Sequence, residues 1–175
     1  MMPRNNKKQV YTYKFVEGTT DKQMKIVKNC MYDRRGWKSR GYRFVPARGT
    51  ADITFYFMKP THMDSMFGHH ERLRGLSVTA TTPNGTSDVY FHLGNWNRPP
   101  AAFKSSSHRR TRYRMYLVNH EIGHALGFNH VTADTVAQHA AKQRRSTQPT
   151  PSCPIMLQQS KMTLPLCRNN PYVSL

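Results

Sequence analysis

The residues with the clearest chemical meaning lie between Val118 and His130, where the sequence reads VNHEIGHALGFNH. His120 and His124 are four residues apart, which places them about 40° apart around a helix and about 6 Å apart along it. Both imidazoles can therefore reach one metal ion from the same helix face. Glu121 directly follows the first histidine, so its carboxylate can serve as the general base for a water held by that metal.

A third histidine follows a glycine after the second one. Gly127 can adopt a positive φ and end the helix, so that the chain turns back and presents His130 to the same metal. Three histidine ligands leave the fourth position of a tetrahedral zinc ion open for water, which is typical of a catalytic zinc site. The alternative is that the histidines are polar surface or core residues, but the opposite helix face already supplies apolar residues. The spacing therefore predicts one catalytic Zn2+ held by His120, His124 and His130, with Glu121 as the catalytic base.

The chain that must position these residues has 175 residues, which fits a single domain with a hydrophobic core. No stretch approaches the roughly 20 apolar residues of a transmembrane helix. Residues 1–8 are polar and basic, and no apolar run follows them, so we expect a flexible basic arm and no secretory signal peptide. An intracellular or virion-associated protein is the corresponding expectation. Residues 9–175 would then form the single catalytic domain.

The charge of the chain is strongly unbalanced. Lysine and arginine total 27 against 9 aspartates and glutamates, a formal net charge of +18. Such an excess favours polyanionic partners, which include nucleic acid, an anionic membrane surface and acidic proteins. A generally basic and highly soluble surface is the alternative.

Hydrophobic patterning predicts an α+β fold with an irregular C-terminal third. Strands are expected at 9–16, 41–45, 52–58, 75–81 and 87–93. Helices are expected at 21–33 and 109–127, and loops at 59–74 and 94–108. The Pro83-Asn84-Gly85 turn predicts a hairpin between the last two strands. Four arginines between Arg109 and Arg114 oppose the dipole at the start of the second helix, which fits either a bound anion or a solvated basic face.

Three cysteines exclude a disulfide scaffold. Cys153 and Cys167 could close a loop of about 15 residues or could remain two buried thiols, and both readings stay open. Cys30 is left over and is expected to be buried on the first helix.

The adjacent His69 and His70 are interpreted as surface residues, because neighbouring side chains point apart.

The pattern from His120 to His130 is the signature of the metzincins, a clan of zinc endopeptidases, and the sequence resembles them here. The resemblance implies a zincin-like fold: a twisted mixed sheet, a first helix, a zinc-binding active-site helix and an irregular C-terminal part with a methionine turn beneath the metal. Met156, in Cys153-Pro154-Ile155-Met156, is the methionine that this resemblance selects. It also implies that the strand at 76–81 borders the cleft, where a peptide substrate would add to its edge.

A narrower resemblance is to an uncharacterised actinobacterial family of metzincin-like domains. It covers most of residues 9–172 and is strongest at 113–130 and 153–171. The other segments that fit are YTYKFVEGT near the N-terminus, Arg35-Gly36-Trp37 and Asn95-Trp96. The substrates of that family are not established, so the resemblance bears on fold and site more than on a pathway.

Two hypotheses follow for function. The first is a zinc-dependent endopeptidase acting on a peptide or protein substrate. The second is a basic structural or nucleic-acid-associated protein, such as a virion protein, that retains a zincin fold. The segment 131–152, which is long for the loop before a methionine turn and carries Lys142, Arg144 and Arg145, is interpreted as a basic inserted loop for specificity or docking.

Overall fold

The structure is a computed structural model that describes residues 9–70, 73, 75–100, 103, 108–132, 134, 153–159 and 170–173. Its strands are β1 (Val10–Phe15), β2 (Arg43–Pro46), β3 (Ile53–Met58), β4 (Val78–Thr81) and β5 (Ser87–His92). Its helices are α1 (Asp21–Tyr32), the 3-10 helix η1 (Trp37–Arg40), α2 (Pro60–Phe67), α3 (Leu93–Asn97) and α4 (Arg109–Ala125).

The strands form one mixed sheet in the order β2-β1-β3-β5-β4. All neighbours are parallel except β4, which runs antiparallel to β5 as the first strand of the expected hairpin. The sheet and its helices confirm the α+β prediction. Within the described strands, β4 lies at one edge of the sheet and β2 at the other.

The first helix forms where the sequence predicts it. Thr20 and Gln23 make a reciprocal capping box, which satisfies backbone N–H groups at the start of α1. The helix buries Val27, Cys30 and Met31 against the sheet and α4. Its burial therefore follows from apolar residues that recur on one helix face.

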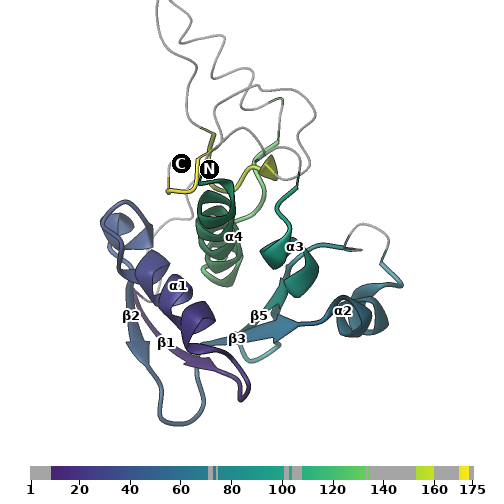
Figure 1. Ribbon diagram of the computed structural model, residues 1–175. Helices are drawn as coiled ribbons and strands as arrows, with labels where there is room; N and C mark the ends of the chain where they lie inside the picture. Colours follow the sequence, from purple (N-terminus) through teal and green to yellow (C-terminus); the bar gives the residue numbers. More distant parts are fainter. Residues whose placement is uncertain are drawn as a thin grey trace, which may run out of the picture.

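Helices α1 and α4 cover the same face of the sheet, and α2 lies apart from them beyond β3 and β5 (Figure 1). The main core joins α4 residues such as Leu117 and Ile122 to strand residues such as Phe55 and Phe91. Trp37 of η1 is fully buried and donates its Nε1–H to the Asn119 carbonyl of α4, over 2.8 Å. The long helix is thus fixed from the sheet on one side and from η1 on another.

Two predicted loops contain helices instead. Helix α2 lies inside the predicted loop 59–74, because Pro60 occupies a first-turn position where proline favours a helix and does not interrupt it. Its Met63 packs with Val78 and Tyr90 in a separate small core. Helix α3 lies at the start of the predicted loop 94–108, and His92 caps its N-terminus by accepting a hydrogen bond from the Asn95 N–H.

The strands β2 and β3 are consecutive in the chain but are not neighbours in the sheet. Both strands pair with β1, on opposite sides, so the chain crosses from one side of β1 to the other. At the crossing, the Asp52 carboxylate accepts hydrogen bonds from the N–H and the hydroxyl of Thr12, both over 2.7 Å. These hydrogen bonds satisfy the Thr12 N–H and the Asp52 carboxylate at the point where the chain enters β3.

Several predictions fall on residues outside the described ranges. These are the arm 1–8, residues 135–152 of the predicted basic loop, and Cys167, so they stay predictions. Cys153 is disulfide-bonded, and Cys30 is a buried free thiol. Across the described ranges, every helix is too short or too polar to cross a membrane.

Candidate metal centre

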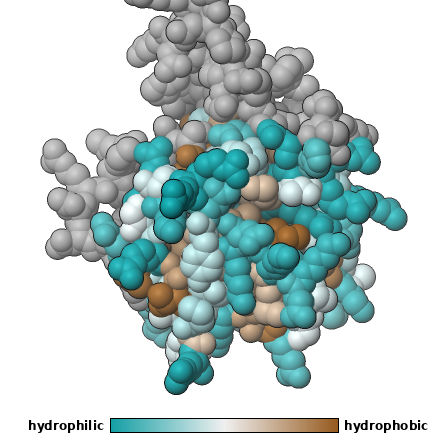
Figure 2. Space-filling view, turned by 60° about the vertical axis from the view of Figure 1, so that its left-hand side comes forward, coloured by the Kyte–Doolittle hydropathy of each residue, from teal (hydrophilic) through white to brown (hydrophobic). Residues whose placement is uncertain are grey.

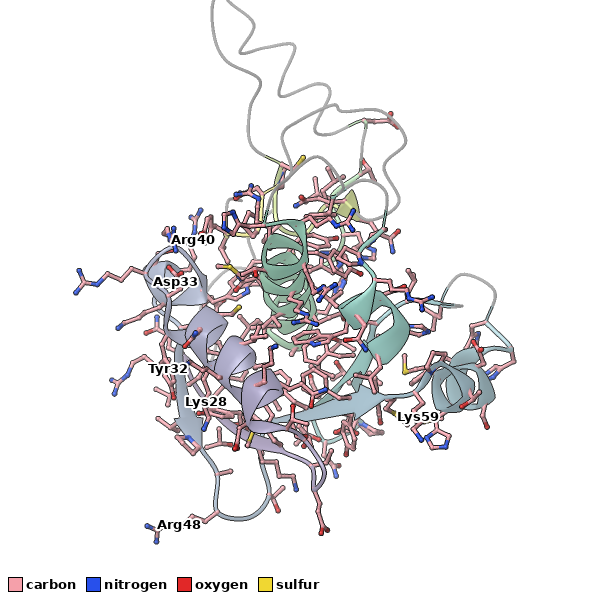
Figure 3. The ribbon with its side chains drawn as sticks, viewed as in Figure 1. Lys28, Tyr32, Asp33, Arg40, Arg48 and Lys59 are labelled. Atoms are coloured by element: carbon pink, nitrogen blue, oxygen red, sulfur yellow. The ribbon has the colours of Figure 1, made fainter. Side chains whose placement is uncertain are left out.

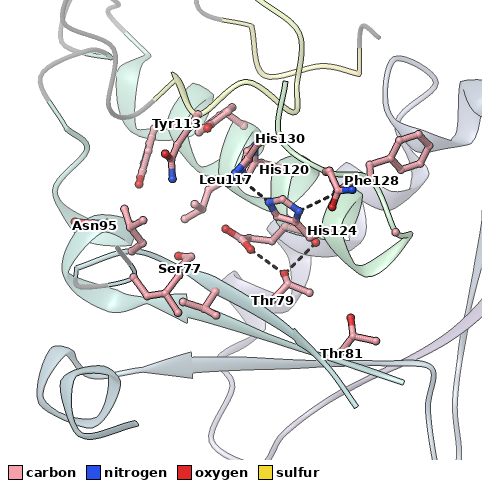
Figure 4. A pocket seen from close by; sticks show the side chains of 18 residues that line it. Ser77, Thr79, Thr81, Asn95, Tyr113, Leu117, His120, His124, Phe128 and His130 are labelled. Carbon is pink, nitrogen blue, oxygen red and sulfur yellow. Dashed lines mark hydrogen bonds between the residues drawn. The ribbon is translucent and has the colours of Figure 1, made fainter. Parts of the chain in front are cut away.

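Three imidazole rings converge at the C-terminal end of α4 (Figure 4). Nε2 of His130 lies 3.1 Å from Nε2 of His120 and 3.0 Å from Nε2 of His124. These three side chains are the one group of ligating residues able to hold a metal ion within the described part of the chain. His120 is buried, His124 is half-buried and His130 is exposed, so one side of the cluster is open.

Backbone carbonyl groups fix which ring nitrogens face the centre. Nδ1 of His120 lies 2.8 Å from the Ile155 carbonyl oxygen, and Nδ1 of His124 lies 2.9 Å from the Phe128 carbonyl oxygen. A carbonyl oxygen only accepts, so each Nδ1 carries the proton and each Nε2 keeps its lone pair. Such outer hydrogen bonds are typical of histidines that ligate metals.

The donor set fits a divalent metal such as zinc. Tetrahedral zinc with Zn–N distances of about 2.0–2.1 Å separates its nitrogen ligands by about 3.3 Å, close to the spacing of these rings. Burial, and then the neighbouring His124, lower the pKa of His120 to about 3. Burial, and then His130, lower the pKa of His124 to about 4. Both rings are therefore held in the neutral form that a metal ion requires.

The turn after α4 brings His130 next to the other two histidines. Gly127 has a φ of +85°, and its N–H donates to His124 O while the Phe128 N–H donates to Gly123 O. This pair of bonds is the Schellman motif, which requires the left-handed conformation that glycine adopts without strain. The Phe128 ring then packs 4.9 Å from the ring of Trp37. The predicted helix end at Gly127 and the reversal toward His130 are confirmed.

The segment 153–159 supports the site from its buried side. The Met156 carbonyl accepts a hydrogen bond from the Val131 N–H over 3.1 Å, directly after His130. The Met156 side chain is 1% exposed and lies against Gly123 of α4. A Cβ at Gly123 would lie 2.8 Å from Trp37 Cζ2 and 3.2 Å from Met156 Cε, so only glycine permits this approach. The family resemblance selects Met156 as the methionine beneath the metal, and in the structure its side chain packs against α4 at Gly123.

Glu121 is buried beside the histidines and faces the sheet edge. The Thr79 hydroxyl, on β4, lies 2.8 Å from Glu121 Oε2 and 3.1 Å from the Glu121 carbonyl oxygen. Burial raises the pKa of Glu121 to about 7, and the hydrogen bond from Thr79 opposes that rise. A carboxylate with a pKa near 7 is suited to both accepting and returning a proton.

A cavity of about 400 Å³ opens in front of the cluster. The three histidines and Glu121 line one side of it, and Ser77, Thr79 and Thr81 of the β4 region line another. Its apolar lining comes from the side chains of Leu73, Leu76, Tyr113, Leu117 and Phe128. The cavity is therefore bordered by the edge strand, the histidine-bearing helix α4 and apolar side chains, which is typical of a site for an organic ligand.

Sequence reasoning gave no role to several residues that build the site. Nothing in the sequence distinguishes Thr79 from the other threonines, because its contact with Glu121 arises only from tertiary packing. Gln159 is fully buried and exchanges hydrogen bonds with the Asn170 backbone, its Oε1 accepting over 2.9 Å and its Nε2 donating over 3.1 Å. Tyr116 donates to the Leu157 carbonyl and accepts from the Gln159 N–H. Gln159 and Asn170 both lie in the segment 153–171, where the family resemblance is among the strongest.

Other candidate residues lie outside the cluster. The rings of His69 and His70 are 4.1 Å apart and exposed, after the end of α2. The arginine-rich start of α4 is at the opposite end of the helix from the histidines.

A family model described as "Protein of unknown function (DUF3152)" matches residues 4–172. The chain belongs to this family. Neither the curated proteins nor the solved structures include a match to it. The DUF3152 match spans the histidine cluster, Glu121, Thr79 and the segment around Met156. The cluster is thus a possible metal site in a family whose description assigns no function.

Proposed function

We propose that this protein is a zinc-dependent endopeptidase of metzincin type. One observation carries the proposal: three Nε2 atoms converge beside a buried carboxylate, and an open cavity lies in front of both. The order histidine, glutamate, histidine on one helix, with a third histidine after a glycine turn, supports the same reading. The placement of Met156 beneath α4 supports it further.

His120, His124 and His130 would hold the zinc, since neutral imidazole nitrogens suit this ion. When bound, zinc supplies Lewis acidity, which polarises a scissile carbonyl and makes water more acidic. Glu121 would take the proton from the attacking water and return it to the leaving amine. Thr79 would hold the Glu121 carboxylate in place for both steps, because its hydroxyl donates to Oε2.

A peptide substrate has a natural place along β4. This strand pairs only with β5 among the described strands, so its other edge can accept a further strand. An extended peptide that adds to this edge would lie alongside the cavity and its histidines. Backbone hydrogen bonds would give affinity, and the apolar lining would select among substrate side chains.

The proposal is tested with a peptide library and the variant Glu121→Gln, which keeps the side-chain shape and removes the base. We expect the zinc-loaded wild-type protein to cleave peptides and the variant to lose at least about 100-fold of that rate, in the range of general-base catalysis. Equal zinc content and thermal stability in both proteins would exclude loss of the fold. Cleavage at the wild-type rate by Glu121→Gln would contradict the proposed mechanism.

A second candidate function is binding of nucleic acid by a basic protein in which zinc serves stability. The distribution of charge over the molecule favours such binding. It is compatible with peptidase activity, because the described residues that line the cavity include no lysine or arginine.

A further inference from the structure

A cluster of positively charged side chains lies on one side of the molecule. Eight exposed lysines and arginines come from α1, η1, β2 and the loops that join them. This α1 basic face comprises Lys22, Lys25, Lys28, Arg34, Lys38, Arg40, Arg43 and Arg48. Arg40, Lys28 and Arg48 follow the outer flank of α1 and β2 in Figure 3, and Lys59 lies on the other side of the molecule.

The segment at the opposite edge of the sheet has few charged residues of its own, although Arg114 of α4 lies over the Trp96 ring of α3. Residues 75–97, which include β4, β5 and α3, contain neither lysine nor arginine, and their one acidic residue is Asp88. The cavity lies at this edge, whereas β2 and the α1 basic face lie at the other.

Acidic side chains do not neutralise the α1 basic face. Residues 21–48 contain two acids, Asp21 and Asp33. Asp33 pairs with Arg35 over 2.8 Å, and hydrogen bonds from Arg35 hold the pKa of this carboxyl below its usual range. This is the only ion pair between described side chains, and it involves none of the eight cations.

An aromatic ring lies within the cationic face. Tyr32 is 45% exposed although it belongs to the last turn of α1. Its hydroxyl donates to the Phe44 carbonyl of β2 over 3.3 Å and lies 3.1 Å from the Tyr13 hydroxyl of β1. Lys28 and Lys25 precede it by four and seven residues, so all three share one side of the helix. The Tyr32 ring is therefore held in place by its hydroxyl, and it is exposed to solvent beside lysine side chains.

We propose that the α1 basic face binds single-stranded nucleic acid. Lysine and arginine side chains would contact the phosphates, and the exposed Tyr32 ring would stack on an unpaired base. Figure 2, with this side turned forward, shows hydrophilic side chains with small hydrophobic patches between them. An anionic membrane fits less well, because the Tyr32 hydroxyl is bonded inward and its ring cannot leave the surface to enter a bilayer. This inference is independent of the proposed peptidase function.

The test measures fluorescence anisotropy of a labelled single-stranded oligonucleotide of about 16 nucleotides, the upper site size of a single-strand-binding fold. The full chain is compared at about 50 mM and about 200 mM salt, where counterion release weakens binding steeply. The double variant Lys25→Glu, Lys28→Glu removes charge from the face. The matched control Lys59→Glu, Arg98→Glu makes the same charge change on exposed residues elsewhere.

We expect the face variant to weaken binding at least about tenfold, and the control to change it less than about twofold, at the same net charge. Tyr32→Ala should weaken binding about fivefold or more, whereas Tyr32→Phe, which keeps the ring, should retain most of it. Equal losses in face variant and control would overturn the proposal, and so would no binding at the lower salt. Preference for a duplex of the same length, or for phosphatidylserine vesicles over the oligonucleotide, would also overturn it.

Discussion

The Thr79 hydroxyl lies 2.8 Å from Glu121 Oε2, and this hydrogen bond joins the edge strand of the sheet to the carboxylate beside the three clustered histidines. The two residues are 42 positions apart in the sequence. Because β4 also borders the cavity, the strand that would bind a substrate also orients the proposed base.

Removing this hydrogen bond should impair catalysis without removing zinc. Thr79→Val keeps the shape of the side chain but loses the donor, and a hydrogen bond to a charged group contributes about 1.5–3 kcal/mol. We expect kcat to fall about tenfold or more, with zinc content unchanged. Thr79 lowers the pKa of Glu121, so its loss should raise that pKa and move the acidic limb of the rate profile to higher pH.

The conservative variant Thr79→Ser is the control for this prediction, because it retains the hydroxyl. Its kcat and pH profile should stay near those of the wild-type protein. If Thr79→Val and Thr79→Ser behaved alike, the hydrogen bond would have no part in positioning Glu121.

Gly123 should tolerate no side chain. Because a Cβ there would collide with Met156 and Trp37, Gly123→Ala should lower the free energy of unfolding by about 1–3 kcal/mol, as overpacked cores do. Chemical denaturation of the metal-free protein measures this directly. Gly85→Ala is a useful comparison: Gly85 has a φ of +77° but open space around it, so its effect should come from the backbone alone. An unaltered midpoint in Gly123→Ala would mean that Met156 does not pack as described.

The sequence predicted the site better than its surroundings. Histidine spacing and Gly127 depend on local helix geometry, so His120, His124 and His130 could be placed together from the sequence alone. The contact of Thr79 with Glu121 and the pairing of Gln159 with Asn170 depend on segments that only the tertiary fold brings together. Helix α2 was missed because the proline, glycine, histidines and mixed charges of residues 59–74 indicate a loop, although proline at a first-turn position favours a helix.

The metal-free protein should lose stability in mild acid. The pKa of His120 is about 3 in the folded state, against an ordinary value of 6.5, so below about pH 6.5 the unfolded state binds more protons. Stability is therefore present above about pH 6.5 and declines as the pH falls toward the folded pKa. Denaturation midpoints between about pH 7 and pH 5 should fall, and His120→Gln should show a shallower decline. The same decline in both proteins would assign the acid sensitivity to other groups.

Cysteine chemistry gives a further prediction. Burial, and then Asp33, raise the pKa of Cys30 to about 12, so its thiol should resist modification in the folded protein. A thiol-specific reagent should label no cysteine in the native protein and one in denaturant without reductant, given the disulfide at Cys153. Labelling of three cysteines under the second condition would show that Cys153 and Cys167 are thiols in solution.

Zinc content per chain tests the central claim most directly. The protein should be purified without chelators, together with His124→Ala and the control His62→Ala, which alters an exposed histidine of α2 away from the cluster. We predict one zinc per chain in the wild-type protein and in His62→Ala, and its loss in His124→Ala. No zinc in the wild-type protein, with none taken up when zinc is added, would contradict the metal site and the peptidase proposed from it.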